Sequence, residues 1–172
     1  MEIMSGLFLR KEPKMVTDNI IVEGARIGFR NFSGKPDMYN KKGGVRTFCV
    51  FFDSERGSEL ENIGWHIKWL KPKEEGDEPT AYLQVAVRFD NYPPKVVLVS
   101  KGGRTILKSD TIDVLDSAEL RDVKLAIKPY NWERDGNKGV KAYLKTGYFY
   151  LDEDEFESEF APVQDDNDDV PF

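Results

Sequence analysis

The chain has 172 residues, of which 40% are hydrophobic and 33% charged, and its formal net charge is −6, a size and composition that suit one folded domain. A single cysteine and a single histidine exclude an internal disulfide and a cysteine-based metal cluster, and leave little for a histidine base. No apolar run approaches the roughly 20 residues of a membrane-spanning helix, so we expect a cytoplasmic protein without a membrane partner.

The charges are unevenly distributed along the chain. The segment 152–172 has ten acidic residues and no Lys or Arg, whereas residues 1–151 carry 25 basic and 21 acidic side chains. A mildly basic body with an acidic tail can have a polyanionic partner, which the net charge alone would argue against. We expect an N-terminal arm over 1–18, a folded domain over 19–151 and an acidic, disordered tail over 152–172.

The first half of the expected domain alternates strand-like segments with polar loops. Alternation begins at Asn19 and runs to Arg30, and residues 31–44 form a polar loop rich in glycine and lysine. Residues 45–52 are rich in β-forming side chains, and 54–63 are compatible with a short helix that ends at Gly64. A further strand is expected around 65–69, before a charged loop over 71–79.

The second half has the clearest strand signals. Residues 81–89 alternate strictly, 96–99 and 105–107 flank a turn at 101–104, and 110–119 favour a short helix. Two long strands, 121–132 and 139–151, are joined through Asp135-Gly136, a strong hairpin signal. This pattern predicts an all-β domain with one or two short helices. An OB-like small barrel fits the helices inserted between strands, although the pattern alone does not separate a barrel from a sandwich.

Because side chains point alternately to the two sides of a strand, odd and even positions assign the residues of the last hairpin to two faces. With Asp135 and Gly136 at the turn, the apolar sets of the two strands share one face: Val123, Leu125, Ile127, Val140, Ala142 and Leu144. The other face then carries Lys128, Tyr130, Trp132, Lys141, Tyr143 and Lys145. The predicted register pairs Tyr130 with Lys141, Lys128 with Tyr143 and Ala126 with Lys145.

A face of alternating lysine and aromatic side chains is suited to single-stranded nucleic acid, because cations contact phosphates and rings stack on bases. The alternative is an ordinary sheet surface with cross-strand Lys–Tyr pairs. Similar residues recur elsewhere, which favours nucleic-acid binding; the further candidates are Arg30, Phe32, Tyr39, Lys41, Lys42, Arg46, Tyr82 and Arg88. Salt bridges would equally explain Arg46 and Arg88, and simple exposure to solvent would explain Lys41 and Lys42 in the loop.

Nothing in the sequence points to catalysis, a metal or a cofactor. The glycine-rich turns at 41–44 and 101–104 lack the Walker spacing, and the acidic stretch 152–159 lacks the glycine of an EF-hand loop. Cys49 is expected to be a small buried side chain, and His66 a surface one. We therefore expect a protein that is not an enzyme and needs no cofactor.

The last eight residues, DDNDDVPF at 165–172, resemble the acidic tip of bacterial single-stranded DNA-binding proteins. In that family several acidic residues precede an aliphatic residue, a proline and a terminal phenylalanine. The resemblance implies a partner-binding segment formed by Asp168, Asp169, Val170, Pro171 and Phe172. A solubilising tail would explain the acidic residues but not Val-Pro-Phe.

The body is similar to the single-stranded DNA-binding proteins of bacteriophages over roughly 19–151. The stretches that carry this are EGARI (23–27), RNFSG (30–34), YN (39–40), GWHIKWL (64–70), RFDNYPPK (88–95), KPYNW (128–132) and GVKAYLK (139–145). The resemblance implies an OB fold, sequence-tolerant binding of single strands in the host cytoplasm, and recruitment of replication, recombination and repair proteins. The N-terminal strand motif and the long linker of the cellular bacterial proteins are absent, so their tetrameric state is not carried over and self-association stays open.

Three other functions remain compatible with the sequence. The same fold could serve an RNA-binding or nucleoprotein-assembly module, which would prefer RNA in competition. A metal-dependent phage nuclease would cleave DNA with magnesium, and a structural virion protein would not bind oligonucleotides.

Overall fold

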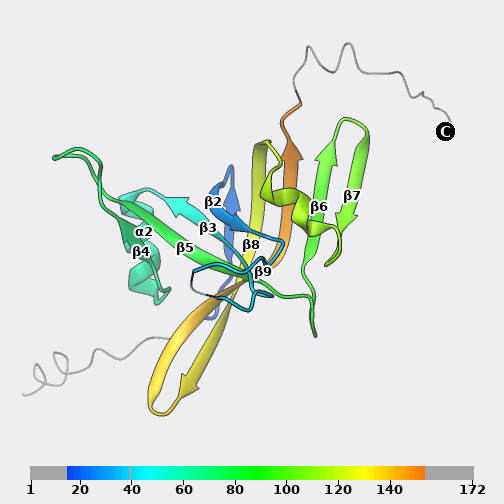
Figure 1. The fold of residues 1–172 in the computed structure, drawn as a ribbon. Helices are drawn as coiled ribbons and strands as arrows, with labels where there is room; N and C mark the ends of the chain where they lie inside the picture. The colour runs from blue at the N-terminus through cyan, green and yellow to red at the C-terminus, as the bar shows by residue number, and fades with distance from the viewer. Residues whose placement is uncertain (1–14, 39, 154–172) are drawn as a thin grey trace, which may run out of the picture.

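The computed structural model describes residues 15–38 and 40–153, which form one continuous β-sheet with a helix and a short 3-10 helix (Figure 1). The strands are β1 Ile20–Glu23, β2 Arg26–Asn31, β3 Arg46–Phe52, β4 Lys68–Leu70, β5 Thr80–Val87, β6 Lys95–Ser100, β7 Gly103–Leu107, β8 Leu120–Arg134 and β9 Asn137–Leu151. The helix α2 spans Ser54–Ile63, and the 3-10 helix η1 spans Ile112–Asp116. The predicted helix over 54–63 is confirmed, and the helix expected within 110–119 is a 3-10 helix.

The strand order identifies the architecture. The sheet runs β1-β8-β9-β5-β3-β2, and its pairs along this path are antiparallel except β5 with β9, which are parallel. β1 and β2 are two parts of one strand that bends at Gly24, where φ is +66°. Because β1 pairs with β8 and β2 with β3, this bent strand closes the sheet into a five-stranded barrel. The all-β, OB-like prediction is confirmed, and a two-sheet sandwich is excluded.

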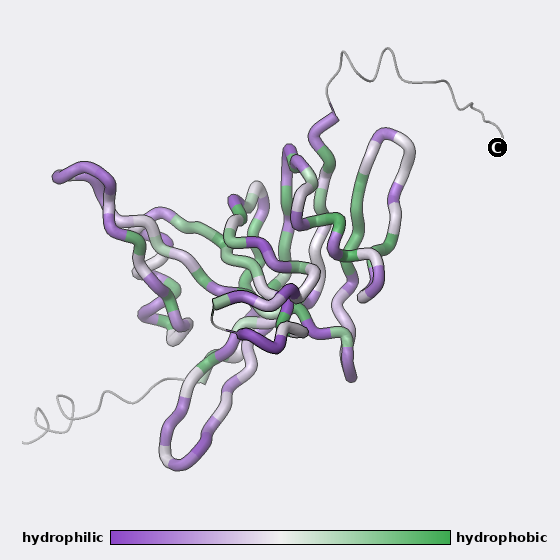
Figure 2. Tube along the Cα trace, viewed as in Figure 1, coloured by the Kyte–Doolittle hydropathy of each residue, from purple (hydrophilic) through white to green (hydrophobic). Residues whose placement is uncertain are grey.

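The β8–β9 hairpin is the longest element, with 15 residues in each strand. Its turn end projects from the body and is mostly hydrophilic (Figures 1 and 2). Asp135 and Gly136 have φ values of +52° and +83°, as the predicted two-residue hairpin turn requires. The barrel end of the hairpin packs between β1, β5 and β6.

The predicted register of this hairpin holds near the turn and fails further away. Tyr130 pairs with Lys141 and Lys128 with Tyr143, as expected. The expected pairing of Ala126 with Lys145 is wrong, because Ala126 pairs with Thr146 and the register shifts between Ala126 and Ile127. Lys145 is the extra residue of a β-bulge in β9.

The barrel interior is filled by aromatic and aliphatic side chains from both halves of the chain. Phe32 stacks on Phe48 with ring centroids 4.9 Å apart and meets Phe149 edge-on at 5.8 Å. All three rings are fully buried. β5 has the predicted buried face, since Ala81, Leu83, Val85 and Val87 are all buried, but the alternation is not complete because Ala86 is buried as well. Close packing of this kind fixes the barrel on which the surface residues are presented.

Peripheral segments attach to this barrel by specific contacts. The Asp53 carboxylate caps α2 by accepting the backbone N–H of Arg56 at 2.8 Å, and Gly64 ends the helix. Val16, in the predicted arm, is buried, and its backbone N–H and carbonyl both bond to the Asn131 amide, at 2.9 and 2.8 Å. No helix within 15–38 and 40–153 is long and apolar enough to cross a membrane.

Candidate nucleic-acid interface

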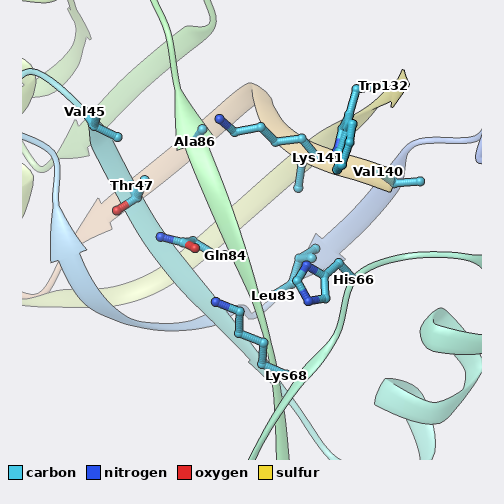
Figure 3. A pocket seen from close by; sticks show the side chains of 11 residues that line it. Val45, Thr47, His66, Lys68, Leu83, Gln84, Ala86, Trp132, Val140 and Lys141 are labelled. Carbon is cyan, nitrogen blue, oxygen red and sulfur yellow. The ribbon is translucent and has the colours of Figure 1, made fainter. Parts of the chain in front are cut away.

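The first part of the candidate site is a groove of about 300 Å³ beside the projecting hairpin, here called the strand groove (Figure 3). Its lining residues come from β3, β4, β5, β8, β9 and the segments that precede β3 and β4: Val45, Thr47, His66, Lys68, Leu83, Gln84, Ala86, Trp132, Val140, Lys141 and Ala142. The register of β3 on β5 pairs Thr47 with Ala86. In Figure 3 the side chain of Lys141 extends from β9 toward Ala86.

Polar and aromatic groups of the strand groove are suited to a phosphorylated, ring-bearing ligand. Lys68 and Lys141 supply cations, while Thr47, His66 and Gln84 can donate or accept hydrogen bonds. Trp132 is 38% exposed and lies against its cross-strand partner Gly139. A Cβ at residue 139 would approach the indole to 2.6 Å, so glycine is needed for the ring to lie flat there.

The second part is a groove of about 440 Å³ on the same hairpin, here called the tyrosine groove. It is lined by Arg88, Asp90, Asn91, Tyr92, Lys128, Pro129, Tyr130, Tyr143 and Leu144. Tyr130 and Tyr143 pack edge to face with ring centroids 5.8 Å apart, and the Lys128 ammonium lies 5.8 Å from the Tyr92 ring centroid. Tyr92 is 83% exposed and Tyr130 53%, so both present open ring faces.

One ion pair lies in the tyrosine groove. The Arg88 guanidinium bonds to the Asp90 carboxylate at 2.6 Å, and both side chains are more than half exposed. The hydrogen bond from Arg88 lowers the pKa of Asp90 below its ordinary value, and the same contact raises the pKa of Arg88. Asp90 is the one carboxylate among the residues that line this groove, and it neutralises one of its cations.

The two grooves join into one surface. The Lys141 ammonium, which lines the strand groove, lies 5.5 Å from the ring centroid of Tyr143, which lines the tyrosine groove. Ala86 in the strand groove is also the β5 partner of Tyr143. We call this surface the binding strip: Thr47, His66, Lys68, Gln84, Arg88, Tyr92, Lys128, Tyr130, Trp132, Lys141 and Tyr143. It interleaves four cations with four aromatic rings.

Most hairpin candidates lie where parity placed them. Lys128, Tyr130, Trp132, Lys141 and Tyr143 all line the strip, and so does Arg88. Lys145 is exposed but lines neither groove, because it is the extra residue of the β9 bulge. Tyr82 is half-buried beside the strip, with its ring centroid 6.0 Å from that of Phe29 and 6.2 Å from that of Phe51.

The placement of Phe32 on the surface is wrong. β2 is irregular between Gly28 and Asn31, and Phe29 has a φ of +48°, so Phe29 turns outward and is 63% exposed while Phe32 enters the core. The guanidinium of Arg30 donates to the carbonyls of Leu115 and Ala118 at 3.1 and 2.6 Å, which ties it to the η1 region. Arg30 is therefore engaged in holding the fold.

Of the remaining candidates, one contacts the core of the fold, two are exposed lysines, and the others lie outside the described residues. Arg46 donates to the Phe32 carbonyl at 2.8 Å and lies 5.6 Å from the ring centroid of Phe89. Lys41 and Lys42 are exposed in a turn but line neither groove. Outside the described residues lie the candidates Tyr39, Asp168, Asp169, Val170, Pro171 and Phe172.

Sequence reasoning missed several strip residues. Thr47, Lys68, Gln84 and Tyr92 were not among the candidates, and His66 was expected only to be a surface residue, which its exposure confirms. Tyr92 carried a usable signal, because an aromatic ring in a Pro-Pro turn has no strand neighbours to bury it. Cys49 is buried as expected, and burial raises the pKa of its thiol to about 11, so it is an inert core residue.

Residues 10–171 match the family described as "Putative phage ssDNA-binding domain". The chain is similar to a C-terminally truncated single-stranded DNA-binding protein from bacteriophage Enc34, with 14% identity, coverage of 87% of this chain and 98% of that chain, and a TM-score of 0.46. The same phage protein in complex with ssDNA gives 15% identity, 83% and 96% coverage, and a TM-score of 0.46.

A third similar structure is gp2.5, a single-stranded DNA-binding protein encoded by bacteriophage T7, with 12% identity, coverage of 87% of this chain and 97% of that chain, and a TM-score of 0.36. No curated protein sequence matches the chain.

Proposed function

The chain belongs to the family of phage ssDNA-binding domains, and we propose that it binds single-stranded DNA along the binding strip, without sequence preference and without catalysis. The observation that carries the proposal is the joined pair of grooves in which lysines alternate with exposed rings. Lys128 and Lys141 would contact phosphates, whereas Arg88 is paired with Asp90. Tyr130, Trp132 and Tyr92 would stack on bases, at about 1–3 kcal/mol per base.

The geometry favours a single strand over a duplex. Ring faces can stack only on bases that are unpaired and turned outward, whereas a duplex offers this surface its phosphates and groove edges. Stacking does not distinguish strongly among the four bases, which accounts for tolerance of sequence. The exposed lysines Lys41, Lys42 and Lys145 belong to the proposal as phosphate contacts outside the strip.

A binding role fits the described residues better than a nuclease role. Within 15–38 and 40–153 there is no group of three His, Cys, Asp or Glu side chains that could hold a metal ion. A direct check is to incubate the protein with magnesium and labelled DNA, which we expect to stay intact.

An RNA-binding function is tested separately, by competition between oligo-dT and oligo-U at fixed salt.

The proposal is tested by titrating fluorescent poly-dT and a duplex of equal phosphate number at two salt concentrations. Poly-dT should bind more tightly, and log K should fall with log salt by about 0.7 for each neutralised phosphate. Equal affinity for duplex, or no dependence on salt, would contradict single-strand binding.

We further propose that the C-terminal segment 168–172 recruits replication and recombination proteins. The support is its sequence, because Val170, Pro171 and Phe172 follow a run of acidic residues, a combination that suits an apolar pocket with a basic rim. Phe172→Ala removes the ring while the acidic residues stay the same. Partner binding should fall while DNA affinity is unchanged; normal partner binding would reduce the segment to a solubilising tail.

A further inference from the structure

The end of the β8–β9 hairpin that lies in the barrel carries a second basic and aromatic surface, here called the upper track. It consists of Tyr148 and Tyr150 with four cations around them: Lys95, Arg104, Arg121 and Lys124. Lys95 and Arg104 lie 5.7 and 5.8 Å from the Tyr148 ring centroid. Arg121 and Lys124 lie 5.2 and 5.6 Å from that of Tyr150.

The β-bulge at Lys145 puts these tyrosines on the same face as the binding strip. In a regular strand Tyr143 and Tyr148 would point to opposite faces, because they are five positions apart and side chains alternate between the faces. The extra residue reverses the alternation, so that Lys124 pairs with Tyr148 just as Lys128 pairs with Tyr143. The core confirms the reversal, since Leu144 and Phe149 are both buried although they too are five residues apart.

The cations of the upper track are available to a ligand. Within the described part of the chain, Lys95, Arg104, Arg121 and Lys124 form no ion pair within 4 Å, and all four are exposed. The nearest carboxylates by register belong to Glu23, the β1 partner of Lys124, and Asp122, which accepts the backbone N–H of Val123. A third carboxylate, that of Glu153, lines a groove together with Arg121 and accepts the backbone N–H of Lys101. Four cations therefore face three carboxylates.

The upper track continues the binding strip. Lys124 and Lys128 lie on one face of β8, four residues or about 13 Å apart. Lys95 begins β6 three residues after Tyr92, which lines the tyrosine groove. A strand of DNA that leaves this groove along the hairpin would meet Lys124 and Lys95 next.

We propose that the upper track is a second contact for the same DNA strand, and that it binds phosphates rather than bases. This inference rests on the proposed function. The half-buried rings of Tyr148 and Tyr150 are each flanked by two cations, which leaves the cations facing outward and the rings less open to bases. A DNA strand short enough to lie within the two grooves does not reach the upper track. A longer DNA strand reaches it, so that its affinity is higher and depends more steeply on salt concentration.

The test compares the double variant Arg104→Gln/Lys124→Gln with the control Lys71→Gln/Lys73→Gln, which removes the same charge from the exposed loop between β4 and β5. Each is titrated with dT oligonucleotides of about 6 and about 25 nucleotides, one near the lower end of the range of about 4–16 nucleotides for one OB domain and one above that range. For the long oligonucleotide the track variant should bind about 10-fold more weakly, with a salt slope reduced by about 1.4 for two lost phosphate contacts.

The short oligonucleotide should bind the track variant and the unmodified protein within about 2-fold, and the control variant should change neither affinity by more than this. Equal losses for both lengths, or no loss for the long one, would overturn the inference. Tighter binding would show instead that the track holds the acidic tail, and a changed oligomeric state would show that it holds a second copy. If the unmodified protein binds neither oligonucleotide, the proposed function itself fails.

Discussion

The two halves of the β8–β9 hairpin contain the same residue types in different surroundings. In the projecting half, Tyr130 and Trp132 are 53% and 38% exposed, and among the described strands β8 pairs there with β9 alone. In the barrel half, β9 lies between β8 and β6, and both neighbours supply cations that flank Tyr148 and Tyr150. The number of neighbouring strands thus decides how far a ring on this hairpin is open to a base.

A fully buried ring is the extreme case in this comparison, so its removal should have the largest effect, which is on the stability of the fold. Phe32→Ala removes a fully buried ring that stacks on Phe48, and should lower the free energy of unfolding by about 3–5 kcal/mol. Denaturant unfolding measures this directly. A variant as stable as the unmodified protein, with weakened DNA binding, would instead restore Phe32 as a contact residue.

Removing an open ring should affect binding and leave the fold intact. Tyr130→Ala and Trp132→Ala should each weaken binding of oligo-dT by about 1–3 kcal/mol, since each removes one stacking surface. Melting temperatures should hardly change. Tyr150→Ala is the matched comparison in the barrel half, and it should cost less binding energy than either; an equal loss would mean that all these rings stack alike.

The comparison also shows how far the sequence predicts this molecule. Alternation and the Asp135-Gly136 turn are local signals, so β5, α2 and the hairpin register near the turn were predictable. The bulge at Lys145 was not, because an extra exposed lysine looks like any other surface residue. The outward turn of Phe29 rests on a positive φ that its residue type does not signal.

The grooves could not be predicted for a different reason. Half of the strand groove comes from β3, β4 and β5, and these strands lie beside the hairpin only because the barrel closes. The alternation of side chains along the hairpin strands therefore predicted the hairpin side of the site, but it could not predict Thr47, Lys68 or Gln84. It also could not show that carbonyls near η1 occupy the guanidinium of Arg30.

A smaller effect is expected from Gly139→Ala, which tests the open half without removing any ring. The new Cβ would lie 2.6 Å from the Trp132 indole, so the ring must move off the strand. We expect oligo-dT to bind more weakly, by about 1 kcal/mol or less, as stacking is misaligned rather than lost. Gly136→Ala is not a suitable control, because φ at residue 136 is +83° and an alanine would be strained there. The control is Lys138→Ala, which leaves the ring undisturbed and should bind oligo-dT normally.

The smallest effect concerns the ion pair in the tyrosine groove. Asp90→Asn frees Arg88 for a phosphate, and should tighten oligo-dT binding about 2- to 3-fold while steepening the salt slope by about 0.7. Because the pKa of Asp90 is lowered, the carboxylate stays charged at neutral pH, and the gain should be constant between about pH 6 and 8. Unchanged affinity and slope would show that Arg88 does not reach the DNA.

The central claim is that bases stack on the open half of the hairpin, and tryptophan fluorescence tests it most directly. Trp65 is buried and Trp69 half-buried, whereas Trp132 lies in the strand groove. Adding oligo-dT should quench the fluorescence of the protein, and Trp132→Phe should abolish the quenching while a fluorescent oligonucleotide still reports binding. Quenching that persists in Trp132→Phe, or binding by the unmodified protein without quenching, would contradict the account.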